Sequence, residues 1–132
     1  VTACSNDAMQ HAVLEALEKY PNYPEEMCAE FQTRRDLICE RLNSMPGVSC
    51  HTPTGAFYVF PKVEVPGMNS EEIALKLLEG GVLCSPGTAF GDAGEGHLRF
   101  AYTIGREDIS RGMDRVERVL RELRADCALS SD

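Results

Sequence analysis

The alternation of apolar and polar residues along the chain predicts four helices. In each of them, apolar side chains recur every three or four positions, which places them on one face of a helix. The helices are expected at about residues 6–19, 24–43, 70–79 and 106–124. The apolar faces expected for them are Ala8, Met9, Ala12, Val13, Ala16 and Leu17; Met27, Phe31, Ile38 and Leu42; Ile73, Leu77 and Leu78; and Ile109, Met113, Val116, Leu120 and Leu123.

Capping and terminating residues support these boundaries. Ser5 or Asn6 can cap the first helix, because a short polar side chain can accept a hydrogen bond from a free backbone N–H there. Asn69 is followed three residues later by Glu72, which is the pattern of a capping box at the start of the third helix. The two glycines at 80–81 end that helix.

Runs of β-branched and aromatic residues predict four short strands between the helices. We expect the strands at 48–50, 56–60, 82–84 and 97–103, with an irregular glycine-rich loop at 85–96. The element order is therefore helix, helix, strand, strand, helix, strand, strand, helix. It predicts an α+β fold in which a small mixed sheet of short strands is covered by helices in a two-layer arrangement. We expect residues 1–132 to form a single domain.

Charged residues along the last helix are spaced for pairing within that helix. Acidic residues precede basic ones by four positions, an arrangement that supports an exposed helix face without any ligand. The expected pairs are Glu107 with Arg111, Asp114 with Arg118, and Glu117 with Arg121.

Composition narrows the classes of function. The 132 residues include 13 Lys and Arg against 21 Asp and Glu, a formal net charge of -8. This acidity argues against a nucleic-acid partner, because phosphate binding requires surplus positive charge. No run of about 18 apolar residues occurs, so no membrane partner is expected. The first residues do not resemble a secretory signal, and the six cysteines lack zinc-site spacing, so we expect reduced thiols and a cytoplasmic location.

Arg99 is the residue most indicative of chemistry. In a strand, Leu98, Phe100 and Tyr102 would share one face and Arg99 the other. An arginine among apolar neighbours can anchor a substrate carboxylate, because the planar guanidinium forms two parallel hydrogen bonds with it. The alternative is an arginine that faces solvent or pairs with an internal acid, and the spacing alone favours that alternative.

Other candidate groups lack the context that chemistry requires. The glycine-rich loop at 85–96 lacks the phosphate-binding pattern and carries two acids, which favours turns with positive φ at several glycines. His11, His51 and His97 are far apart and form no metal pair, so surface roles are the simpler interpretation. Lys19, Lys62 and Lys76 show no sign of the desolvated pocket that an amine nucleophile needs. The sequence thus predicts no catalytic residue and no metal ligand in this chain.

Several motifs occur together in a known order. FQTRRDLICERL precedes a proline–glycine turn, PTGAFYVFPKV follows it, and VLCSPGTAFGDAGEGHLRFAYT precedes the last helix. This combination resembles the C-terminal, small domain of class I (fold type I) pyridoxal-phosphate aminotransferases of the aspartate aminotransferase group. The resemblance extends from about Ser5 to Leu123, and each motif alone would be weak.

The resemblance implies roles for two residues and a parent enzyme to which the chain would belong. It places Arg99 where the family binds the substrate α-carboxylate, which reverses the preference drawn from spacing, and it places Phe57 beside the substrate. Residues 1–20 would be the end of the large domain. The parent enzyme would bind pyridoxal 5′-phosphate, act on an amino acid and a 2-oxo acid, and form a homodimer.

The family's catalytic lysine and cofactor-binding residues lie upstream of such a segment, so we expect a fragment that is inactive alone. The resemblance leaves the amino-acid specificity open, and related lyases or synthases share the scaffold. A second hypothesis is a non-catalytic aminotransferase-like module that senses a ligand or binds another protein.

Overall fold

The computed structural model describes residues 6–129, and its secondary structure agrees with an α+β fold. The chain divides into two compact units, one ending at Glu30 and the other beginning at Phe31. Each unit is described by itself. This division does not test the expectation of a single domain with residues 1–20 belonging to a neighbouring one, so that expectation stays a prediction.

The first unit contains the helix α1 (Asp7–Lys19) and the beginning of α2 (Tyr23–Asn43). Asn6 caps α1 by accepting a hydrogen bond from the backbone N–H of Met9, as its sequence position predicts; Ser5, the alternative cap, lies outside the described residues. No residue of α1 is buried, and its apolar face is exposed: Met9, Val13 and Leu17 are each more than half accessible.

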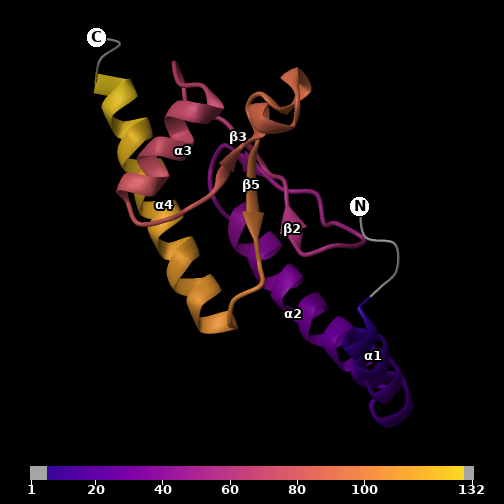
Figure 1. Cartoon of the computed structure of the whole chain (residues 1–132). Coiled ribbons are helices and arrows are strands. Elements are labelled where there is room, and N and C mark those ends of the chain that lie inside the picture. The colour runs from indigo at the N-terminus through magenta and orange to yellow at the C-terminus, as the bar shows by residue number, and fades with distance from the viewer. Residues whose placement is uncertain (1–5, 130–132) are drawn as a thin grey trace. The chain divides into compact units, whose positions relative to one another are not determined.

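The second unit contains all of the strands. The described strands are β1 (Val48–Ser49), β2 (Tyr58–Val59), β3 (Lys62–Val63), β4 (Ser85–Pro86) and β5 (Leu98–Ala101), and the helices are α3 (Ser70–Glu79) and α4 (Arg106–Leu129). β1 pairs with β3, and β5 lies between β2 and β4; each of these pairings is antiparallel. Figure 1 shows β5 beside β2, and α4 beside α3.

The strands differ from the sequence expectation in three ways. The pairing is antiparallel throughout the described residues, where we expected a mixed sheet. The strand β3 was not predicted: Pro61 does end β2, but the chain continues and pairs with β1 (Val48 opposite Val63). The strand expected at 82–84 is wrong, because the N–H of Val82 bonds to the C=O of Leu77 and so closes the end of α3. A strand forms instead at Ser85–Pro86 (β4), where we expected an irregular loop, so with β3 the element order gains one strand in total.

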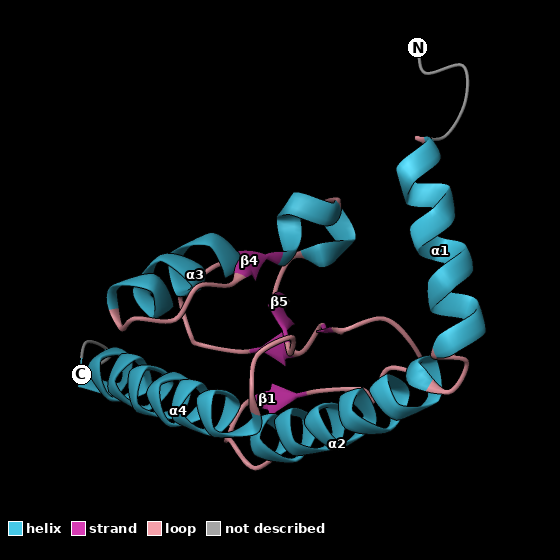
Figure 2. Ribbon diagram, turned by 60° about the horizontal axis from the view of Figure 1, so that its bottom comes forward, coloured by secondary structure: helices cyan, strands magenta, loops and turns pink. Residues whose placement is uncertain are grey.

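The core of the second unit lies between the strands and the helices. Figure 2 shows α4 and the later part of α2 along one side of the strands. The buried apolar side chains come from each of these elements and include Ile38, Leu42, Val59, Val63, Ile73, Leu77, Leu98, Phe100, Tyr102, Ile109, Met113, Val116 and Leu120. The predicted apolar faces of these helices are largely confirmed, but Leu78 is 52% exposed and Ala74 and Val119 take buried positions that were not predicted.

The pairing along α4 also differs from the prediction. Only Glu117 with Arg121 forms as expected, at 2.6 Å. Asp114 instead pairs with Arg41 of α2, at 2.6 Å, while Arg111 pairs with Asp108. Asp114 thus pairs with an arginine on another helix rather than with Arg118, four residues along α4. The sequence of α4 alone cannot indicate such a partner.

Candidate functional site

The strand β5 places Arg99 on the outer face of the sheet. Leu98, Phe100 and Tyr102 are buried, with 1%, 4% and 2% of their surface exposed, whereas Arg99 is half-buried and Ala101 is exposed. This alternation is the period-two pattern of a strand with one face against a core. The predicted orientation of Arg99 is therefore confirmed, and its guanidinium lies on the side of the sheet opposite the core.

Two aromatic rings contact the Arg99 guanidinium. Its central carbon lies 4.4 Å from the centroid of the Tyr58 ring and 4.2 Å from that of the Phe90 ring. At these distances a cation is attracted to the negative face of each ring. Within residues 6–129 the guanidinium forms no ion pair with an acidic side chain. The internal acid considered from the sequence is thus not among its described contacts.

Further rings extend this aromatic surface. Phe60 meets Phe90 edge to face at 6.0 Å and stacks on His97 with centroids 5.1 Å apart. Phe57 contacts Tyr58, with ring centroids 4.6 Å apart, and is 41% exposed. The sequence pointed to Phe57 as the aromatic residue beside the substrate. The rings in contact with Arg99 are instead those of Tyr58, the next residue in the chain, and Phe90.

The glycine-rich loop carries Phe90 to this surface. It contains two short 3-10 helices, η1 (Gly87–Phe90) and η2 (Asp92–Gly94). Positive φ is confirmed at Gly91 and Gly96. Gly87 and Gly94 have a different role: a Cβ on either would lie 2.0 Å from the carbonyl oxygen of the other, so only glycine allows the two backbones to touch.

Glu95 anchors the same loop to the start of α3. Its carboxylate accepts hydrogen bonds from the backbone N–H and the hydroxyl of Ser70, at 2.8 and 3.1 Å, and from the N–H of Gly96 at 2.8 Å. The backbone hydrogen bond from Ser70 is the main cause that holds the pKa of Glu95 below its ordinary value. Because Asn69 and Glu72 also form the predicted capping box, this helix start has two acidic partners.

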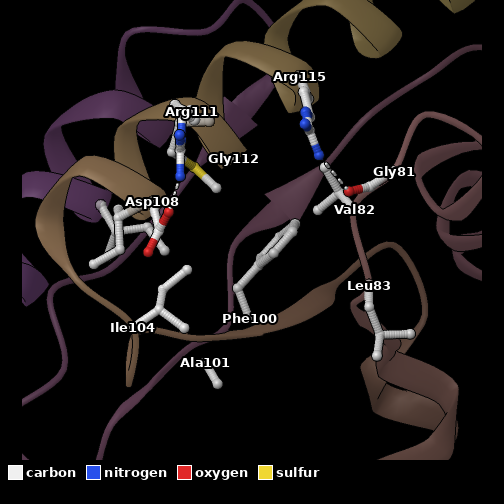
Figure 3. Close-up of a pocket in the computed structure, with 13 residues that line it drawn as sticks. Gly81, Val82, Leu83, Phe100, Ala101, Ile104, Asp108, Arg111, Gly112 and Arg115 are labelled. Atoms are coloured by element: carbon white, nitrogen blue, oxygen red, sulfur yellow. Dashed lines mark hydrogen bonds and ion pairs between the residues drawn. The ribbon is translucent and has the colours of Figure 1, made fainter.

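The structure also has a cavity of about 530 Å³ on a different part of the second unit (Figure 3). Phe100 and Leu83 line it together with the first turns of α4, and Arg99 is not among its lining residues. The charged groups at this cavity already have partners: Arg111 pairs with Asp108, and Arg115 donates to the carbonyl of Gly81. It offers apolar contacts rather than a free charged group.

The lysines do not provide a site for a cofactor that binds through an amine. Lys19 pairs with Glu15, Lys62 with Glu64 at 2.6 Å, and Lys76 with Glu79 at 2.9 Å. These amines lie 48–60% exposed beside carboxylates, which is not the desolvated pocket that a Schiff-base lysine needs. The described part of the chain therefore does not fit an aldehyde cofactor by itself.

In residues 6–129, no group of three His, Cys, Asp or Glu side chains is arranged to hold a metal ion. In the same range, no helix is long and apolar enough to span a membrane.

The comparisons with known proteins establish the family. The model of the family "Aminotransferase class I and II" matches residues 2–116, so the chain belongs to this family. It is 42% identical over 122 residues to an aspartate aminotransferase of Pyrococcus abyssi, and 40% identical over 122 residues to aromatic-amino-acid aminotransferase 2 of Thermococcus litoralis. Among solved structures, it is similar to an alanine aminotransferase from Pyrococcus furiosus, with a TM-score of 0.83 and 39% identity.

The similarity covers most of this chain but only part of each relative. All three of these matches cover 90% of the chain and 31% of the relative. The chain therefore spans about a third of the length of the aminotransferases it matches. The resemblance drawn from the sequence motifs is confirmed at the level of the family.

Proposed function

We propose that this chain is the C-terminal, substrate-carboxylate-binding part of an aminotransferase that moves an amino group between an amino acid and a 2-oxo acid. The observation that carries the proposal is the Arg99 guanidinium, half-buried against two rings and without an acidic partner among the described residues. A guanidinium that lies over aromatic rings can still donate two parallel hydrogen bonds from its N–H edge to a carboxylate. Family membership supports the same role.

We propose the following division of labour among the chain's own residues. Arg99 binds and orients the α-carboxylate, and Phe57 supplies apolar surface beside the substrate. When Arg99 engages the carboxylate, this part of the enzyme closes on the remainder and excludes water from the reacting bonds.

The family implies a dependence on pyridoxal 5′-phosphate. Since the three lysines of this chain are paired at the surface, we propose that residues outside it hold the cofactor and that the chain alone is inactive. We also propose a homodimer, from the family resemblance, and a cytoplasmic location, which the free thiols at positions 28, 39, 50, 84 and 127 support.

Replacement of Arg99 in the whole enzyme tests the proposal. We expect Arg99→Ala to lower kcat/KM for amino acids about 100-fold, equivalent to ~3 kcal/mol, because a charged hydrogen-bonding partner of the substrate is lost. Arg99→Lys keeps the charge but not the two-pronged geometry, so an intermediate loss is expected. Binding of the cofactor, followed by its visible absorbance, should be unchanged in both.

Arg118→Ala serves as the matched control, because Arg118 is an exposed arginine paired with Glu122 on α4. It should leave kcat/KM within about twofold of the wild-type value. Unchanged kinetics in Arg99→Ala would remove Arg99 from the substrate site. Absence of amino-group transfer by the whole wild-type protein, rather than by the variant, would favour the non-catalytic module.

A further inference from the structure

The two rings on Arg99 come from separate elements of the second unit. Tyr58 belongs to β2 and lies opposite Ala101 in the antiparallel register, two residues beyond Arg99 on β5. Phe90 ends η1, in the loop that the contact between Gly87 and Gly94 closes. Strand pairing thus places the backbone of Tyr58, and the closed loop places that of Phe90, so both residues are brought to Arg99 by contacts that do not involve it.

This arrangement restricts how the guanidinium can turn. A free arginine side chain has many rotamers, and ordering it on a ligand costs conformational entropy. Rings against the guanidinium restrict it before a ligand arrives, and a carboxylate can then meet the polar N–H edge directly. Pre-ordering of this kind increases affinity by lowering the cost of binding rather than by adding a contact.

We propose that Tyr58 and Phe90 are positioning residues, which hold the Arg99 guanidinium with its N–H edge presented to the substrate carboxylate. This inference rests on the proposed function, since it assumes that Arg99 binds a carboxylate. Neither ring needs to touch the reacting atoms. The ring itself is the functional feature of both residues, because the contact is made by its face and the Tyr58 hydroxyl has no hydrogen bond within residues 6–129.

The test compares ring-removing with ring-keeping substitutions in the whole enzyme. Tyr58→Leu and Phe90→Leu remove a ring and keep apolar volume. Each should weaken binding of maleate, an unreactive planar dicarboxylate, and raise the KM for the amino acid by about 3- to 10-fold, with little change in kcat. Tyr58→Phe and Phe90→Tyr keep a ring and should restore most of the binding. Arg118→Ala, the exposed substitution on α4 used above, is the neutral control.

A spectroscopic measurement follows Arg99 without relying on activity. In the ¹H–¹⁵N NMR spectrum of the 132-residue chain, the two rings over which the guanidinium lies should shield the Nε–H proton of Arg99 and shift its signal upfield. Loss of that signal in Arg99→Lys identifies it. The signal should move downfield in each leucine variant and return in each ring-keeping variant, which a general loss of stability would not produce.

The outcomes separate this inference from the proposed function. If Arg99→Ala leaves maleate binding unchanged, the proposed function fails. If Arg99→Ala weakens maleate binding but both leucine variants bind it normally, the positioning inference is overturned and the proposed function stands. Failure of the ring-keeping variants to restore binding would also overturn the inference, because the ring would not then be the feature that matters.

Discussion

At the scale of single residues, the environment of a side chain decides its chemistry more than its type does. The cysteines illustrate this. Cys39 and Cys50 are both buried, with their sulfur atoms 3.9 Å apart, whereas Cys28 is exposed on α2. Burial, and secondarily the neighbouring Cys39, raises the pKa of Cys50 to about 12. Burial likewise raises the pKa of Cys84 to about 11.

We therefore expect the thiols to react at very different rates. At pH 8 a thiol of pKa about 12 is ionised in about one molecule in ten thousand, and the thiolate is the reactive form. Iodoacetamide should modify Cys28 before Cys50 and Cys84, and should leave those two largely unmodified in the folded chain, as measured by peptide mass spectrometry over time. Unfolding in urea should equalise the rates. Early modification of Cys50 in the native chain would contradict its burial.

The site residues show how far sequence reasoning extends at this scale. The orientation of Arg99 follows from alternation within one strand, so the sequence predicts it. Tyr58 directly follows Phe57, the residue that the family resemblance indicated. Alternation along the strand expected at 56–60 would have placed Tyr58 and Phe60 on the same face. Phe90 carried no such signal, because its position depends on the glycine contact that folds the loop.

At the scale of elements, local signals determine where helices start, and distant segments complete them. The capping box of Asn69 and Glu72 is visible in the sequence and present in the structure. Glu95, 25 residues from Ser70, adds hydrogen bonds to the same helix start. A carboxylate there is favoured by the N-terminal end of the helix dipole. The loop with Phe90 is thereby connected to α3.

Substitution of Glu95 should change stability in a pH-dependent way. The folded-state pKa of Glu95 lies below its ordinary value of 4.5, so its stabilising effect is present above that pH and is lost as the pH falls through the folded pKa. Glu95→Gln should lower Tm by a few degrees at pH 7, and the difference from the wild type should shrink and then vanish as the pH falls through the folded pKa. Thermal denaturation followed by circular dichroism measures both.

Glu122→Gln is the control for this experiment, because Glu122 is exposed and paired only along α4. Its Tm should match that of the wild type throughout the pH series. A Glu95→Gln difference that does not shrink as the pH is lowered would show that the ionised carboxylate is not the stabilising group.

At the scale of the whole molecule, the chain corresponds to only part of the length of its aminotransferase relatives. It covers 31% of the aminotransferases compared with it, and its three lysines are paired at the surface. The exposed apolar face of α1 is also explained if another part of a larger protein covers it. These observations support a substrate-binding part that needs further residues for activity.

We therefore expect the purified 132-residue chain to transfer no amino group. With pyridoxal 5′-phosphate, an amino acid and a 2-oxo acid, its rate should equal that of the cofactor alone, as measured by chromatography of the products. Saturable transfer above that background would contradict the proposal and require an amine in this chain to act.

In the source cells, an antibody to the chain should detect a band well above 14.5 kDa.

The sequence by itself determined the helices, the orientation of β5 and the family, because these depend on patterns and hydrogen bonds within a few residues. The tertiary structure decided which strands pair, that Asp114 binds Arg41, and that Tyr58 and Phe90 contact Arg99. Those contacts join residues far apart in the chain. Many residues of the same type could form each of these contacts, and only the packing of the core determines which ones meet. No local sequence pattern can therefore identify them.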